Sequence, residues 1–316
     1  MKIIVTGVAG FIGSTLAEKL ASQGHDVVGV DCFTNYYSRK IKENNLKNLM
    51  KAQNFSFINK DLLHLDLPDL LSSADVVFHE AAQAGVRKSW GVDFDLYVRN
   101  NISVTQALLE AAKECSLSHF VYASSSSVYG DAESFPTKET CLPRPVSPYG
   151  VTKLACEHLC GAYIKNFKLP ITMLRYFTVY GPRQRPDMAF HKFIKAALEG
   201  KTISVYGDGK QTRDFTYVSD IVDANLLVLE KNIREGIFNI GGGARITLNE
   251  AIHTIEDLTC KEIKIAYLSP EKGDAKHTSA DIRKAKQMLG YRPKTETKEG
   301  LSREIDWIKS NIDILL

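Results

Sequence analysis

The sequence lacks the features that mark several broad classes of protein. It contains no run of the roughly 18 consecutive apolar residues that a membrane-spanning helix requires. Its 40 lysines and arginines are nearly balanced by 37 aspartates and glutamates, which gives a net charge of +3. The chain therefore lacks the excess of positive charge that is typical of nucleic-acid-binding proteins. Its hydrophobic content of 44% is too high for an intrinsically disordered protein. We therefore expect a globular protein with no membrane and no nucleic acid among its partners.

The six cysteines form no C-x-x-C pair, the spacing most typical of a structural zinc site. Cys156 and Cys160 are four residues apart and could share a helix face, but no histidine completes a ligand set. We therefore predict no metal site and expect reduced thiols. The chain also opens directly into an apolar segment at residues 2–5, without the pattern of a signal peptide. Both observations predict a cytoplasmic location.

Short apolar runs alternate with amphipathic helical patterns through the first 175 residues. The runs that predict buried strands are 3–5, 27–30, 55–58, 76–78, 120–122 and 171–174. The helical patterns between them include 14–22, 98–115 and 149–167. Nearly continuous apolar strands that alternate with helices are typical of a parallel sheet covered on both faces. The sequence therefore predicts an α/β fold with a doubly wound parallel sheet of the Rossmann type.

The pattern changes after residue 175. Prolines and a Gly-Asp-Gly turn at 207–209 break up the next segment, whereas a helix at 219–230 and a strand at 237–240 resemble one more unit of the sheet. The domains that we expect are a sheet domain of 1–175 plus about 215–245, and a smaller mixed α/β lobe of about 176–214 plus 246–316. Small molecules commonly bind in a cleft between two such lobes.

Three glycines follow the first predicted strand and open a helix. Gly7, Gly10 and Gly13 form G-x-x-G-x-x-G, which lets the backbone approach a pyrophosphate whose charge the helix N-terminus stabilises. Asp31 ends the second strand, where a carboxylate can bind both ribose hydroxyls and would repel a 2′-phosphate. The first domain is therefore predicted to bind NAD rather than NADP.

Other cofactor contacts are expected where the glycine loop and the third and fourth strands end. Residues 61 and 62 would lie near the adenine, and small residues at 81 and 82 would let the cofactor lie close, although tight packing alone could also explain two alanines. The residues concerned are Phe11, Ile12, Asp61, Leu62, Ala81 and Ala82.

The motif Y-x-x-x-K begins a predicted helix and carries the expected chemistry. Tyr149 and Lys153 would lie on one helix face, one turn apart. An ammonium beside a phenol lowers the phenol's pKa from its usual value near 10, so the tyrosine can accept a hydroxyl proton at neutral pH. The lysine can also reach the nicotinamide ribose. The serine-rich segment 124–130 leaves the fifth strand at the end where parallel sheets bind ligands.

Together these motifs resemble the extended short-chain dehydrogenases/reductases that act on nucleotide sugars. The resemblance covers essentially the whole chain, and it implies that Ser125 bonds the reacting hydroxyl, that Tyr149 is the base and that Lys153 is its partner. Other implied roles are a structural or proton-relay asparagine at Asn101, a diphosphate clamp at Arg213 and a nucleotide contact at Asp274. The family also implies a homodimer that pairs helices near 94–115 and 149–167. Lys272 departs from relatives that carry arginine there.

The residues after Ser125 separate the reactions of this family. In the family, sugar 4,6-dehydratases have a pattern similar to Thr-Asp-Glu at this position, and UDP-glucuronate decarboxylases have one similar to Ser-Glu. This chain instead has Ser126 and Ser127 after Ser125. Hydroxyl groups can hold a carboxylate but cannot run an elimination, so this pair favours simple epimerisation. Segments 31–37, 81–87 and 177–189 are similar to UDP-glucuronate 4-epimerases.

Substrate contacts follow from the same resemblance. Thr178 replaces the asparagine of UDP-glucose and UDP-galactose epimerases, and with Ser126 and Ser127 it would hold the sugar carboxylate. Arg87 and Arg185 could stabilise that carboxylate or the diphosphate. Either arginine could instead pair with a nearby aspartate such as Asp187.

We therefore predict an NAD-dependent UDP-glucuronate 4-epimerase, with a UDP-sugar as its substrate. Three alternatives stay open at this point: a UDP-glucose/UDP-galactose 4-epimerase, a UDP-glucuronate decarboxylase and a non-catalytic NAD-binding scaffold.

Overall fold

A parallel β-sheet forms the centre of the molecule. Within residues 1–269, 271 and 273–315, which the computed structural model describes, it has seven strands in the order β11-β6-β5-β4-β1-β2-β3. Their bounds are β1 (Lys2–Thr6), β2 (Asp26–Asp31), β3 (Phe55–Asn59), β4 (Val76–His79), β5 (His119–Ser125), β6 (Ile171–Tyr176) and β11 (Gly236–Ile240). The predicted strands all lie in this sheet, so the predicted fold class is confirmed.

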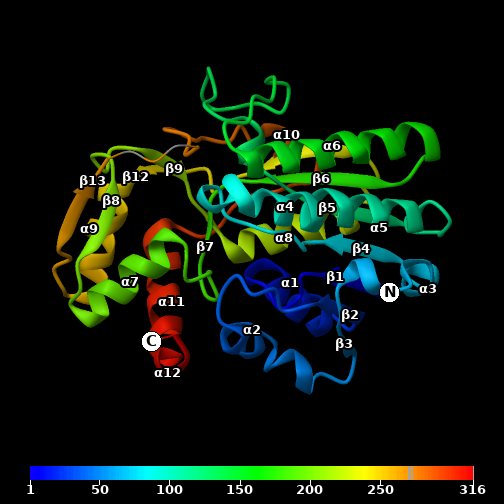
Figure 1. Cartoon of the computed structure of the whole chain (residues 1–316), viewed down its shortest axis with the longest axis horizontal. Helices are drawn as coiled ribbons and strands as arrows, with labels where there is room; N and C mark the ends of the chain where they lie inside the picture. The colour runs from blue at the N-terminus through cyan, green and yellow to red at the C-terminus, as the bar shows by residue number, and fades with distance from the viewer. Residues whose placement is uncertain (270, 272, 316) are drawn as a thin grey trace.

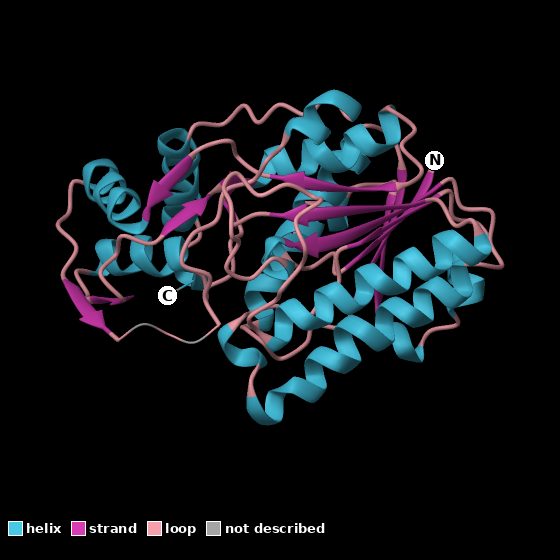
Figure 2. Cartoon of the chain, turned by 90° about the horizontal axis from the view of Figure 1, so that it is seen from above, coloured by secondary structure: helices cyan, strands magenta, loops and turns pink. Residues whose placement is uncertain are grey.

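Helices cover both faces of the sheet because alternate strand residues point to opposite sides. Ile3 and Val5 pack into one apolar cluster, whereas Ile4 between them packs into the other. The first face is covered by α1 (Phe11–Ser22), α2 (Arg39–Leu46), α8 (Val218–Glu230) and α10 (Arg283–Met288), and the second by α3 (Leu67–Ser72), α5 (Val104–Ala112) and α6 (Pro148–Phe167). Figure 2 shows the strands sandwiched between these two layers of helices.

The helix that the sequence predicts at 98–115 is not uniform. It is preceded by α4 (Phe94–Tyr97), passes through a π-helical turn at Val98–Ser103 and continues as α5 only to Ala112. The turn contains Asn101, whose side-chain oxygen accepts from the backbone N–H of Gln83 (2.7 Å) and whose amide donates to the Thr152 hydroxyl (3.0 Å). Asn101 therefore ties the segment after β4 to α6, in keeping with the structural one of its two implied roles.

A second group of elements lies beside the sheet (Figure 1). Its helices are α7 (Ala189–Glu199), α9 (Leu248–Thr259), α11 (Thr297–Ser310) and α12 (Ile312–Leu315). Two short strand pairs accompany them: β8 (Ile203–Tyr206) with β13 (Ile265–Leu268), and β9 (Thr212–Asp214) with β12 (Arg245–Thr247). A further pair, β7 (Val179–Tyr180) with β10 (Thr216–Tyr217), connects segments from both expected domains. We propose residues 176–214 and 246–316 as the substrate lobe, and the remainder as the cofactor domain.

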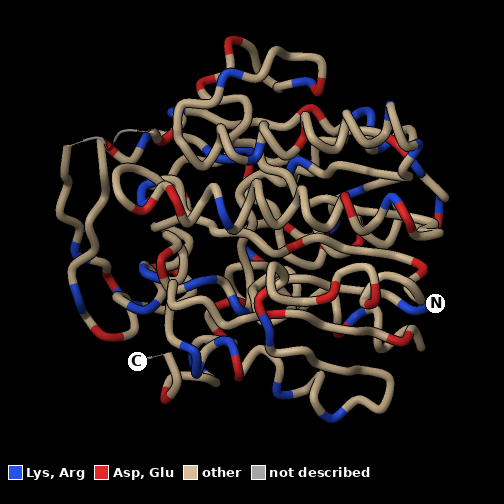
Figure 3. The backbone as a smooth tube through the Cα atoms, turned by 45° about the vertical axis from the view of Figure 1, so that its right-hand side comes forward, with Lys and Arg blue, Asp and Glu red and all other residues tan. Residues whose placement is uncertain are grey.

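Charged residues are mixed over the molecule. Figure 3 shows lysines and arginines interspersed with aspartates and glutamates along the backbone trace. No helix in the described part of the chain is long and apolar enough to cross a bilayer.

The loop between β1 and α1 is packed too tightly for side chains. Gly7 has φ of +67°, and a Cβ there would lie 2.7 Å from Cα of Ala81. A Cβ on Gly13 would lie 2.4 Å from the carbonyl oxygen of Gly7. Glycine at these positions thus permits the close contact of α1 with the sheet, as well as the approach of a ligand.

We predict that Gly13→Ala destabilises the protein by about 1–3 kcal/mol, since the added methyl group overlaps backbone that cannot move easily. Gly161→Ala is the matched control, because Gly161 lies inside α6 and, apart from its chain neighbours and the nearby backbone of its own helix, no described atom lies within 4 Å of the added methyl group. There the free energy of unfolding should rise by up to about 1 kcal/mol. Urea denaturation of both variants measures the difference, and equal stability of the two would contradict the packing argument.

Candidate active site

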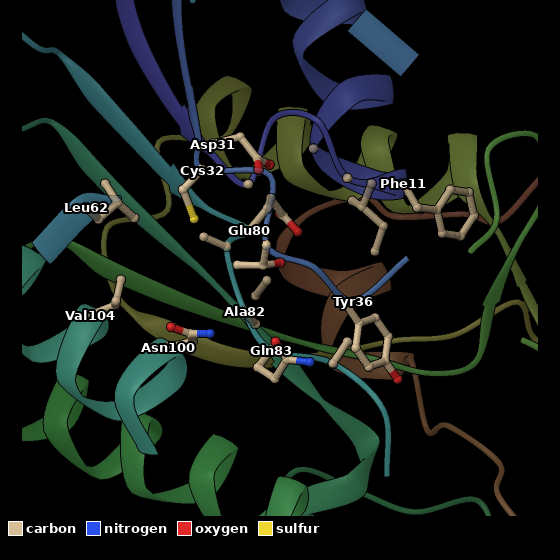
Figure 4. Close-up of a pocket in the computed structure, with 18 of the residues that line it drawn as sticks. Phe11, Asp31, Cys32, Tyr36, Leu62, Glu80, Ala82, Gln83, Asn100 and Val104 are labelled. Carbon is tan, nitrogen blue, oxygen red and sulfur yellow. The ribbon is translucent and has the colours of Figure 1, made fainter. Parts of the chain in front are cut away.

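A cavity lies at the carboxyl ends of the central strands (Figure 4). It brings together residues predicted from six separate segments of the sequence. Those that line it are Gly7, Gly10, Phe11, Ile12, Gly13, Asp31, Asp61, Leu62, Ala81, Ala82, Tyr149, Lys153 and Arg185. The predicted cofactor contacts and the predicted Tyr–Lys pair therefore share one space, as expected where parallel strands end.

The N-terminus of α1 faces this cavity. Gly10 occupies the N-cap position and forms no side-chain cap within the described chain. The N–H groups of the first helical turn are therefore left for a ligand or for water, and they carry the positive end of the helix dipole. Such an arrangement fits the pyrophosphate of a dinucleotide.

Asp31 is held rigidly at the end of β2. Its two carboxylate oxygens accept hydrogen bonds from the backbone N–H groups of Ala9 (3.1 Å) and Phe33 (2.8 Å). Its side chain lies at the cavity next to Cys32 (Figure 4). A carboxylate here can accept from ribose hydroxyls and repels a 2′-phosphate, so the residues present fit NAD better than NADP.

The sequence did not indicate several other residues that line the cavity. Most lie in the loops after β2, β3 and β4 and on the π-helical turn, where no sequence pattern sets the direction of a side chain, whereas Lys42 lies on α2 and Val104 begins α5. They include Cys32, Tyr36, Tyr37, Lys42, Lys60, Glu80, Gln83, Asn100 and Val104. Asp61, which was predicted, is oriented by the N–H of Leu63 (2.9 Å) and by an ion pair with Arg99 (2.8 Å).

Glu80 is the most unusual of these additional residues. Burial raises its pKa to about 7, although the Tyr176 hydroxyl, which donates to it at 2.8 Å, and the positive charge of Lys153 oppose the rise. The carboxyl group is thus only partly ionised near neutral pH. It therefore adds little negative charge to a cavity suited to phosphate groups.

Tyr149 and Lys153 lie at the start of α6. Pro148 is well suited to a first helical turn, and the Ser147 hydroxyl before it accepts from the N–H of Gly150 (3.1 Å), so the helix begins at a defined residue. Lys153 is buried, and its ammonium donates to the carbonyl oxygen of Ala123 in β5 (2.6 Å). The lysine is therefore held against the sheet beside the cavity.

A buried ion pair fastens the same helix one turn further on. Glu157 accepts from both Nε (2.8 Å) and Nη2 (2.6 Å) of Arg175 in β6, and the two side chains are only 4% and 3% exposed. Its carboxylate also accepts from the Ser124 hydroxyl at the end of β5 (2.5 Å). Arg175 in turn donates to the Tyr129 hydroxyl (2.7 Å). This pair was not predicted from the sequence. The signal that could have indicated it is an arginine in the mostly apolar strand β6, since a buried arginine requires a charged partner.

The serines of the predicted substrate site continue directly from this point. The hydroxyl of Ser125 accepts from the N–H of Ser127 (3.1 Å) and donates to the hydroxyl of Ser127 (3.1 Å). Ser125, Ser126 and Ser127 are half-buried, as is Thr178 after β6. Among the described residues it is Ser124 and Ala123, rather than these four, that line the cavity itself.

The three predicted arginines do not gather at one place. Arg87 pairs with Asp274 (2.6 Å) and lies 4.2 Å from the ring centre of Tyr206. Arg213 lies near both of these residues. Burial lowers the pKa of Arg213; the negative charge of Asp274 raises this pKa, and the positive charge of Arg87 lowers it.

Arg185 instead lines the cavity and pairs with Asp187. Both Arg87 and Arg185 therefore have the aspartate partners that the sequence left as an alternative. Lys272, where the sequence departs from its relatives, lies outside the described residues. The described residues contain no group of three or more histidines, cysteines or carboxylates that could hold a metal ion.

We predict that Arg175→Met lowers the free energy of unfolding by about 3–5 kcal/mol, because it leaves the Glu157 carboxylate buried without its counter-ion. Arg39→Met is the control, since it removes the largely exposed pair of Arg39 with Glu43 (2.7 Å) and should cost at most about 1 kcal/mol. Chemical denaturation of both variants tests this, and a small, equal loss in the two would show that the buried pair contributes no more than a surface one.

Comparisons with known proteins agree with this geometry. Residues 3–241 match the model of the NAD dependent epimerase/dehydratase family. The chain is 48% identical to an uncharacterized UDP-glucose epimerase, YtcB, of Bacillus subtilis (98% of each chain), and 40% identical to a UDP-glucuronate 4-epimerase of Thermodesulfobacterium geofontis (99% and 97%). A crystal structure of UDP-glucuronic acid 4-epimerase from Bacillus cereus in complex with UDP-glucuronic acid and NAD superposes with a TM-score of 0.96, at 49% identity over 98% of this chain and 99% of that one. The chain belongs to the NAD-dependent epimerase/dehydratase family.

Proposed function

We propose that this protein is a UDP-glucuronate 4-epimerase, which interconverts UDP-glucuronate and UDP-galacturonate. The observation that carries the proposal is the shared cavity, in which Tyr149 and Lys153 meet both the dinucleotide-binding loop and the cation of Arg185. The relatives from Thermodesulfobacterium geofontis and Bacillus cereus, which bear this name, support it.

The proton transfer is assigned to the start of α6. When bound, NAD supplies a hydride acceptor for C4 of the sugar and afterwards a hydride donor. Tyr149 takes the proton from the O4 hydroxyl as a general base and returns it later, while Ser125 bonds the same oxygen. Lys153, held by the Ala123 carbonyl, lies one helical turn from Tyr149 and is assigned as its partner. The 4-keto sugar turns over in the cleft and presents its opposite face, which inverts C4.

The sugar carboxylate needs separate control. A 4-keto uronate is a β-keto acid, and it loses carbon dioxide readily when its carboxylate adopts the aligned geometry. We assign Ser126, Ser127, Thr178 and Arg185 to holding that carboxylate, because hydroxyls and a guanidinium can bind it without supplying the acid and base of an elimination. The nucleotide end of the substrate is assigned to Arg87, Arg213 and Asp274.

The cofactor contacts belong to the same proposal. The glycine loop with Phe11 and Ile12 is assigned to the pyrophosphate, Asp31 to the adenosine ribose, and Lys153 to the nicotinamide ribose. The adenine and the remaining cofactor surface are assigned to Asp61, Leu62, Ala81 and Ala82.

UDP-glucose/UDP-galactose 4-epimerase is the second candidate. It is favoured by the name of the Bacillus subtilis relative and uses identical chemistry at C4. Thr178 and Arg185 are the residues that separate the two candidates, because a neutral hydroxymethyl group needs no cation beside it.

The substrate is tested by product analysis. The NAD-loaded protein should convert UDP-glucuronate to UDP-galacturonate, with much slower conversion of UDP-glucose to UDP-galactose, as separated by anion-exchange chromatography. A UDP-pentose as the main product would indicate the decarboxylase, faster turnover of UDP-glucose would indicate the second candidate, and no turnover of either sugar would favour a non-catalytic scaffold.

Tyr149→Phe should lower kcat by about 10²–10⁴-fold, because it removes the general base. Tyr163→Phe is the control: this tyrosine lies on the same helix, but its hydroxyl donates to Glu110 away from the cavity. Initial rates with UDP-glucuronate measure both, and a near-normal kcat for Tyr149→Phe would refute the assigned role.

We also propose that the protein is a homodimer that pairs the helical segment 94–115, which contains α4 and α5, and α6 of two copies. Val92 (95% exposed), Leu96 (49%) and Val151 (47%) place apolar side chains on or beside these helices at the surface.

Light scattering should give twice the 35.2 kDa of one chain. Val151→Glu should shift the mass toward one chain, whereas Leu142→Glu, at an exposed apolar residue outside these helices, should leave it unchanged. A monomeric wild-type protein would contradict this proposal.

The place of action is proposed to be the cytoplasm. All six cysteines, which lie within the described residues, are free thiols. Free thiols are typical of a reducing compartment.

A further inference from the structure

Tyr36 connects the cofactor side of the cavity to the segment that carries Arg185. It lies in the loop after β2 and lines the cavity opposite Leu62 (Figure 4). Its hydroxyl donates to Oδ2 of Asp187 at 3.3 Å, across 151 residues of sequence. The chain makes room for this contact with Gly85, where φ is +103° and a Cβ would lie 2.1 Å from the Tyr36 hydroxyl oxygen.

Asp187 holds Arg185 through two parallel hydrogen bonds. Nε donates to Oδ1 at 2.9 Å and Nη2 donates to Oδ2 at 3.0 Å, so one edge of the guanidinium is fully engaged. Within the described residues, Nη1 has no hydrogen-bond partner. Arg185 lines the cavity, whereas Asp187 is not among the described residues that do. Asp187 therefore holds the Nε–Nη2 edge of a guanidinium that lines the cavity, and among the described residues Nη1 is left without a hydrogen-bond partner.

Arg185 is also close to the assigned base. Burial lowers the pKa of Arg185, but the charge of Asp187 and its hydrogen bonds to the guanidinium raise it more, with smaller contributions from Tyr36 and Tyr149, so the pKa is above its usual value. Arg185 and Tyr149 line the same cavity, so a sugar that binds there with its O4 at the phenol lies within the space that the arginine borders. The carboxylate at C6 of a uronate would lie one bond from the ring at the same end.

We propose that Asp187 and Tyr36 are positioning residues that aim Nη1 of Arg185 at the sugar carboxylate, and that they thereby set the preference for a uronate over a neutral hexose. The inference rests on the proposed function and adds to it the source of its selectivity. A free arginine side chain samples many rotamers and would also bond a hydroxymethyl group or water. A guanidinium fixed along its Nε–Nη2 edge still offers one N–H of Nη1 and the second N–H of Nη2 as parallel donors, and this pair favours a carboxylate as acceptor.

The test uses variants that keep the net charge. Asp187→Glu retains the carboxylate but moves it by one methylene group, and Tyr36→Phe removes only the hydroxyl that orients Asp187. Both are made in a Tyr149→Phe background, so that turnover does not change the ligand during titration. The NAD-loaded proteins are titrated calorimetrically with UDP-glucuronate, UDP-glucose and UDP.

Asp187→Glu should weaken UDP-glucuronate binding by about tenfold or more, the range of a lost hydrogen bond to a charged group, and Tyr36→Phe by about threefold. The Kd values for UDP-glucose and UDP should stay within about twofold. Asp281→Glu is the matched control, because Asp281 forms a similar pair with Arg283 two residues along and lies outside the cavity.

The outcomes are distinguishable. If the Tyr149→Phe background itself binds UDP-glucose as tightly as UDP-glucuronate, the proposed substrate fails and the inference with it. If that background prefers UDP-glucuronate and both variants retain the preference, the inference alone is wrong. Equal weakening for all three ligands would also overturn it, because that result indicates general disruption of the cleft.

Discussion

The buried pair of Glu157 and Arg175 is the interaction on which the active end of the molecule depends. Two charges removed from water must satisfy each other completely, so their geometry is restricted far more than that of an exposed pair. Because Glu157 also accepts from Ser124, the pair joins α6, β5 and β6 directly beneath the assigned catalytic groups. Lys153 adds a second attachment one turn earlier, through the Ala123 carbonyl. The Tyr–Lys motif therefore lies on a helix that is fixed against the sheet at two successive turns.

The sequence predicted the sheet well, and the residues that it proposed for the cofactor line one cavity, because both predictions depend on local patterns. An apolar run, a glycine turn and a terminal acid leave signals within a few residues of one another, as Gly7, Gly13 and Asp31 illustrate. Contacts between distant segments leave no such signal. The pairing of Arg87 with Asp274 crosses 187 residues and that of Tyr36 with Asp187 crosses 151.

The π-helical turn at 98–103 also escaped prediction, for a different reason. Hydrophobic periodicity is recognised over windows of about 11–18 residues, so a single wide turn inside a longer helical segment is too short to stand out. Asn101 bonds to Gln83 and Thr152 from this turn, and these partners are set by the tertiary fold. Periodicity therefore gave the correct element but not its internal geometry.

Asp31 has a consequence for attempts to change the cofactor. Its carboxylate is assigned to the adenosine ribose, and it also accepts from the backbone N–H groups of Ala9 and Phe33. Replacement by a small neutral residue would remove the repulsion of a 2′-phosphate, but it would also release the glycine loop and the loop that leads to Tyr36. A redesign toward the phosphorylated dinucleotide must therefore supply a new acceptor for both N–H groups, and selectivity for the cofactor is inseparable from the shape of the substrate-facing loop.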